Sequence, residues 1–290
     1  MDELKNGMAE AIGNFFSMFF GELQNVMNLA QALPDGSDGL ATDFPAATLW
    51  TSATNVSIKA VAPVALTIIA LFLALELISI FERVENKGLE SLYQILMTCL
   101  KMAIAIALCK NMTSIIGACF QLTGTIVSNA SKLITAETIK TTEFAKGLTD
   151  YYKGEDFQFW DLIGPYFVAF LCNSLSKIAF ILAGIVCKLR FIEIYTFTAV
   201  APIPFSTFVN REYKNIGVSF LKRLLALGVQ GVFIMVVCYL YISIVNGSLD
   251  NISINGDPMG AMWAMAGYSI ILIIAVFQTG GWAKSLLQVN

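Results

Sequence analysis

The sequence contains no histidine in its 290 residues. Histidine is the commonest general base and metal ligand in proteins, so its absence disfavours an enzyme that depends on either role. No Cys-x-x-Cys pair and no Gly-x-Ser-x-Gly motif are present, and the six cysteines lie in or beside apolar segments. They are interpreted as small buried hydrophobic residues. The sequence therefore predicts no catalytic, cofactor-binding or metal-binding residues.

Charged residues are also scarce. They make up 13% of the chain against 57% hydrophobic residues, and the mean hydropathy is +0.70. The net charge of −3 gives no overall attraction to nucleic acid or to anionic lipid. This composition is typical of a chain whose main solvent is a lipid bilayer.

Long apolar segments recur along the chain, and they lack the polar face of a helix on a soluble protein. Several reach the roughly 20 residues that a helix needs to cross a bilayer. The clearest segments are Val61–Ile80, Leu92–Cys109, Ile163–Cys187, Leu224–Val245 and Ala261–Phe277.

The segments predict an all-α polytopic membrane protein with about five transmembrane helices. Four regions are expected. Residues 1–56 form an external N-terminal amphipathic helix and linker, and residues 57–127 form the first two transmembrane helices with an outer extension. Residues 128–160 form an outer loop, and residues 161–290 form a C-terminal transmembrane bundle.

The N-terminal helix is predicted from apolar residues at helical spacing, such as Leu4, Met8, Ile12 and Phe15. This stretch has four acids against one lysine, so it lacks the cationic face of a helix that binds a lipid surface. Packing of the helix against another protein is favoured over packing on lipid.

Basic residues in short loops indicate the orientation, because they are retained in the cytoplasm. Arg83 and Lys87 follow the first segment, and six more basic residues follow the third. The loop 246–260 has none. An external N-terminus and a cytoplasmic C-terminus satisfy this pattern if Phe191–Phe208 does not cross the membrane.

Two prolines, Pro202 and Pro204, interrupt the segment Phe191–Phe208. Each removes a backbone donor, and together they stop a regular helix. Such a break at membrane depth needs cover from protein or a water-filled cavity. We therefore expect a re-entrant or interfacial element on the cytoplasmic side, with a sixth, kinked span as the alternative.

Three charged residues fall within the predicted spans: Glu76, Lys101 and Lys177. An unpaired charge at the centre of a span costs about 2.5–3.5 kcal/mol on insertion scales. The three residues either form a polar lining or an intersubunit pair, or the lysines extend their side chains to an interface. Proton-driven carriers more typically have an acid at mid-membrane, so the two lysines disfavour that function.

The C-terminal third carries a pattern that resembles a known family. Its residues are Arg190, Glu193, Ala201-Pro202-Ile203-Pro204-Phe205, Arg211-Glu212, Ile216-Gly217, Leu221-Lys222, Ala226-Leu227-Gly228, Gln230–Met235 and Thr279–Ser285. In this pattern the chain resembles the TrbL-type polytopic membrane subunit of conjugative type IV secretion systems, in the form found on integrative elements and plasmids of Gram-positive bacteria.

The resemblance implies a subunit of the cytoplasmic membrane that forms homo-oligomers and helps move single-stranded DNA with its attached protein. It also implies other secretion subunits and separate ATPases as partners, besides membrane lipid, and no catalysis. We hypothesise that basic residues around the proline element form a cytoplasmic mouth that attracts phosphate non-specifically. They are Lys188, Arg190, Arg211, Lys214, Lys222 and Arg223. Alternatively, these residues only anchor the orientation.

The predicted spans leave two other functions as alternatives. A small-solute transporter would typically contain inverted repeats, and the two halves of the sequence show none. Another oligomeric membrane scaffold would share the spans without the DNA path.

Overall fold

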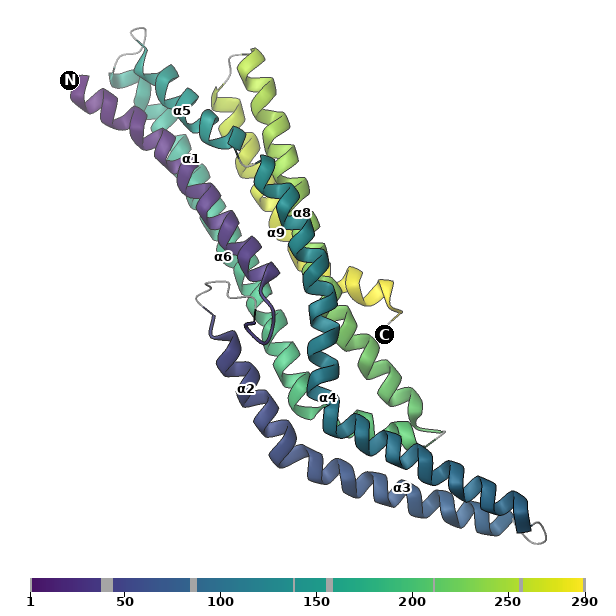
Figure 1. Ribbon diagram of the computed structural model, residues 1–290. Helices are drawn as coiled ribbons and strands as arrows, with labels where there is room; N and C mark the ends of the chain where they lie inside the picture. Colours follow the sequence, from purple (N-terminus) through teal and green to yellow (C-terminus); the bar gives the residue numbers. More distant parts are fainter. Residues whose placement is uncertain are drawn as a thin grey trace. The chain divides into compact units, whose positions relative to one another are not determined.

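The computed structural model describes residues 2–37, 44–83, 88–137, 139–154, 159–210, 212–255 and 258–288. Over these ranges the chain is helical and contains no β-strand (Figure 1). The elements are α1 (Asp2–Gln31), α2 (Ala46–Val56), the π-helix η1 (Ser57–Val61), α3 (Ala62–Arg83), α4 (Gly88–Glu137), α5 (Ile139–Lys153), α6 (Phe159–Val200), α7 (Pro202–Ser206), the 3-10 helix η2 (Thr207–Val209), α8 (Lys214–Asn255) and α9 (Pro258–Leu286).

The described ranges include five helical stretches that are long and apolar enough to cross a membrane. They are Ala46–Glu82, Leu92–Lys132, Trp160–Val200, Lys214–Gly247 and Pro258–Leu286. The prediction of an all-helical protein with five spans is therefore confirmed. With 42 residues each, α6 and α8 are about 63 Å long, twice the thickness of the hydrocarbon layer.

The predicted proline element begins later than expected. α6 continues without interruption through Phe191 to Val200. The helix is interrupted only there, and Pro202 occupies the first turn of the next helix, α7. Proline is tolerated there because its missing N–H has no partner in a helix anyway. Nothing between Phe191 and Val200 stops a helix, so α6 absorbs the first half of the predicted element. Its location at an interface stays a prediction.

The stretch 128–160, predicted as an outer loop, contains helical structure. It holds the end of α4, all of α5 and the start of α6. Its position outside the membrane stays a prediction.

The chain forms two compact units. Unit 1 comprises residues 1–32, 124–189 and 230–282, and includes α1, α5 and α9 as far as Trp282. Its core contains Ile12, Leu162, Phe180 and Ile234. Hydroxyl groups also connect its helices: Ser269 of α9 lies 2.9 Å from the hydroxyl of Ser176 in α6 and 3.2 Å from that of Tyr241 in α8.

Unit 2 comprises residues 33–123, 190–229 and 283–290. It includes the hairpin of α3 and α4, and α7 with η2 packs against α3. The turn η1 ends at Val61, two residues before Pro63, and the N–H of Ala62 donates to the carbonyl of Ser57, five residues back. Because Pro63 cannot donate a hydrogen bond, the preceding turn widens from the α to the π form.

Gly217 allows α8 to approach the proline element closely. A Cβ atom at this position would lie 2.8 Å from the carbonyl oxygen of Pro204 and 2.9 Å from the ring of Phe208. The N–H of Gly217 also donates to the hydroxyl of Thr207, at 3.2 Å. The first turns of α8 are therefore fixed against α7 and η2.

We predict that Gly217→Ala lowers the free energy of unfolding by about 1–3 kcal/mol, because the added methyl group meets a backbone carbonyl that cannot move aside. Thermal unfolding of the detergent-solubilised protein measures the effect. The matched control is Gly247→Ala in the same helix, where a Cβ meets nothing within 4 Å. Equal unfolding temperatures for the two variants would contradict the close approach.

Candidate functional site

Two of the charged residues within the spans line one pocket in unit 2. Glu76 of α3 and Lys101 of α4 both border a cavity of about 670 Å³. The other lining residues are Leu75, Ser79, Ile80, Tyr93, Gln94, Met97, Thr98, Asn210, Glu212 and Tyr213. The hairpin of α3 and α4 thus brings an acid and a base from two spans to the same cavity, which we call the hairpin pocket.

The turn that follows the proline element forms part of this pocket. The side-chain oxygen of Asn210 accepts a hydrogen bond from the N–H of Glu212 at 2.8 Å, which fixes the turn. The ring of Tyr213 stacks on that of Phe72 in α3, with 5.4 Å between centroids. The hairpin pocket therefore has two carboxylates, Glu76 and Glu212, for the single ammonium group of Lys101.

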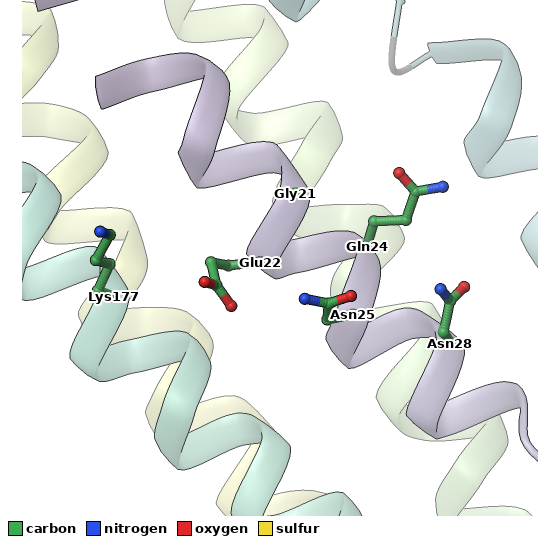
Figure 2. A pocket seen from close by; sticks show the side chains of 6 residues that line it. All are labelled: Gly21, Glu22, Gln24, Asn25, Asn28 and Lys177. Carbon is green, nitrogen blue, oxygen red and sulfur yellow. The ribbon is translucent and has the colours of Figure 1, made fainter. Parts of the chain in front are cut away.

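The third charged residue, Lys177, lines a separate pocket in unit 1. This cavity of about 430 Å³ is bordered by Lys177 of α6 and by five residues of α1, namely Gly21, Glu22, Gln24, Asn25 and Asn28. Figure 2 shows Glu22 and Asn25 extending toward the helix that carries Lys177. We call this cavity the α1 pocket. It places a carboxylate and amides beside a mid-span lysine.

The sequence did not identify Glu22 or Glu212 as counter-charges for the two lysines within the spans. Glu76 was the only acid considered for that role. Glu22 lies on the N-terminal helix, and Glu212 lies in the turn after the prolines. One signal for Glu22 was available. It is the only charged residue between Glu10 and Asp35, just as Lys177 is the only one between Asp161 and Lys188.

The six basic residues of the hypothesised mouth are not equivalent. Lys214, Lys222 and Arg223 are exposed in α8, within unit 2. Arg190 is buried, with its guanidinium 4.9 Å from the ring centroid of Phe191. Lys188 is half-buried and belongs to unit 1.

The structure does not describe Arg211 of this set, nor Lys87 of the first predicted loop. Arg223 lies 5.1 Å from the ring centroid of Phe197, a cation–π contact that holds its side chain near α6. The exposed cations that remain are therefore Lys214 and Lys222, with Arg223 partly held by an aromatic ring.

Both prolines are held in place by neighbouring groups. Pro202 is buried, and its carbonyl accepts a weak bond from the thiol of Cys109 at 3.7 Å. The carbonyl of Pro204 accepts a hydrogen bond from the hydroxyl of Thr207 at 2.7 Å. Among the residues that the structure describes, no group of three or more His, Cys, Asp or Glu side chains could hold a metal ion.

These features define a multi-pass helical membrane protein with charged residues inside its spans. The model of a family described as TrbL/VirB6 plasmid conjugal transfer like protein matches residues 42–202, more than half of the chain. The chain belongs to this family, and it is a membrane component of a conjugative transfer system. No curated protein and no solved structure gives a significant match.

The family match and the resemblance from sequence cover different residues. The match contains α2, α3 and α4 and ends at Pro202, whereas most of the motif residues quoted for the resemblance follow that proline. Glu76, Lys101 and Lys177 all fall inside the match. Glu22 and Glu212 fall outside it.

We predict that Tyr213→Ala lowers the thermal unfolding temperature, because it removes a stacked aromatic pair worth about 0.5–1.5 kcal/mol beyond its buried area. Tyr213→Phe keeps the ring that stacks on Phe72 and should unfold close to the unmodified protein. A large loss in the phenylalanine variant would show that the hydroxyl group, not the ring, holds the turn against the hairpin.

Proposed function

We propose that the chain is a channel or assembly subunit in the cytoplasmic membrane, and that it helps to translocate single-stranded DNA with its attached protein during conjugation. Membership of the TrbL/VirB6 family supports the role in conjugation. The observation that carries the DNA path is the exposure of Lys214, Lys222 and Arg223 in the unit that contains the proline element.

Exposed lysines suit the passage of a strand of any sequence. A phosphate backbone is attracted to them by charge alone, and the attraction weakens as salt is raised. Several copies of the chain around one axis would multiply these charges at the mouth of the path. In this proposal Lys188 and Arg211 add to the same field, whereas Arg190, buried beside Phe191, supports the fold instead of contacting DNA.

The proposal includes the partners and the orientation that the sequence predicts. The subunit forms homo-oligomers, contacts other secretion subunits and receives energy from separate ATPases. Its N-terminus lies outside and its C-terminus in the cytoplasm, so that the start of α8 faces the compartment that supplies the DNA.

We predict that the double variant Lys214→Glu, Lys222→Glu lowers the frequency of conjugative transfer about tenfold or more, since it replaces two attractive charges by repulsive ones. Transfer is measured by mating, and membrane levels of the protein are compared by immunoblot. The matched control is Lys146→Glu, an exposed lysine on α5. Normal transfer at normal protein level would remove these lysines from the DNA path.

We predict that a cytoplasm-specific reporter fused after Asn290 is active, and that one fused before Met1 is inactive. Basic residues following the first and third spans are the reason, because they are retained on the cytoplasmic side. The opposite pattern would overturn the orientation and with it the placement of Lys214 and Lys222.

A further inference from the structure

The N-terminal helix α1 packs along the third span in a regular register. The ring of Phe15 lies 6.4 Å from that of Phe170, and a Cβ atom at Gly184 would lie 3.8 Å from Leu29. Between these contacts, Glu22 and Lys177 line the α1 pocket. The contacts are seven residues apart on both helices, so α1 runs parallel to α6 with the heptad spacing of a coiled coil.

The register aligns two stretches that each contain a single charge. Residues 11–34 contain only Glu22, and residues 162–187 contain only Lys177. Many side chains of α6 in this range are large, apolar and exposed, for example Phe167, Ile178 and Ile181. Such a surface fits the hydrocarbon of a membrane. Because α1 follows α6 over this range, α1 lies at the same depth.

The two faces of α1 differ in polarity. The face toward the core is apolar and buried, and contains Ala9, Ile12, Leu23, Val26 and Ala30. The opposite face is exposed and contains small residues and amides, namely Gly7, Gly21, Gln24 and Asn25.

Amide side chains cannot face hydrocarbon without loss of their hydrogen bonds, so this face needs water or a polar partner. The α1 pocket, of about 430 Å³, is lined by Gln24, Asn25 and Asn28 together with Glu22 and Lys177, so it offers water both room and polar partners. Water is the occupant that these residues suit.

We propose that α1 lies at membrane depth against α6, in place of the external position expected from the sequence, and that its amide face lines a water-filled groove with Glu22 and Lys177 at its middle. The groove is a property of this chain alone. The idea that it forms part of the DNA path rests on the proposed function. Water in the groove hydrates the amides, while the carboxylate of Glu22 offsets the charge of Lys177.

Cysteine accessibility tests the groove. In a cysteine-free variant of the full chain, Gln24→Cys and Asn28→Cys should react with a membrane-impermeant thiosulfonate in intact cells. The control is Ile181→Cys, at the same depth on the apolar face of α6. A thiol in hydrocarbon is not ionised and reacts poorly, so we expect a difference of about tenfold or more. A permeant maleimide applied after detergent solubilisation confirms that all three cysteines are present and free.

Each result decides one proposal. Equal, slow labelling of the three positions would overturn the groove. Disulfide-linked dimers through Gln24→Cys on mild oxidation would also overturn it, because the face would then be covered by a second copy. If positions 24 and 28 are labelled but the bulky adduct leaves mating frequency unchanged, the groove stands and its place in the DNA path is wrong.

A charge exchange tests separately whether Glu22 offsets the charge of Lys177, with which it lines the α1 pocket. Glu22→Lys and Lys177→Glu each place two like charges beside the α1 pocket, so membrane levels of the protein should fall about fivefold or more. The exchanged double variant should recover to within about twofold of the original level, since opposite charges face each other again. No loss in either single variant, or no recovery in the double, would overturn the pairing.

The matched control pair is Glu10 and Lys153, whose side chains are joined at 2.7 Å and are 59% and 35% exposed. An ion pair in water contributes little to stability. Glu10→Lys should therefore leave the level of the protein nearly unchanged. A loss as large as that from Glu22→Lys would show that α1 tolerates no charge reversal anywhere, and would overturn the specific role of membrane depth.

Discussion

Charges inside a bilayer need a partner, and this requirement organises the structure. Hydrocarbon supplies neither water nor counter-ions, so a lysine within a span must meet an acid, an amide or a wet cavity. Here the compensating groups come from outside the apolar segments. The N-terminal helix brings Glu22 to the pocket that Lys177 lines, and the turn after the prolines brings Glu212 to the pocket that Lys101 shares with Glu76. Segments that could be regarded as appendages are thus part of the membrane domain's electrostatics.

The spans could be predicted from sequence because hydrophobicity is a local property. The five apolar runs correspond to five long helices in the structure, and the amphipathic spacing of the first thirty residues corresponds to α1. The continuation of α6 through Phe191 was harder to predict. The two prolines mark where a helix must stop, but they do not show where the helix before them begins. The shared pocket of Glu22 and Lys177 was not predicted, since sequence spacing carries no record of which helices become neighbours. The register between α1 and α6 depends on tertiary packing, which only coordinates reveal.

The family match divides the charged residues in an informative way. Glu76, Lys101 and Lys177 lie within the matched residues 42–202, and the two added acids lie on either side of them. The matched part therefore contains both deep lysines, while flanking segments contribute most of the compensation. The proline element lies where the match ends, and Gly217 fixes α8 against it. The exposed cations at the start of α8 therefore lie on a helix that is fixed against the proline element, and not in a loop.

The seven-residue register between α1 and α6 has one more consequence. Sliding α1 along its neighbour by a single helical turn, about 5.4 Å, would move Glu22 out of the α1 pocket that it lines together with Lys177. The two charges and the amides that line this pocket therefore favour the observed register of α1 on α6 over a register shifted by one turn.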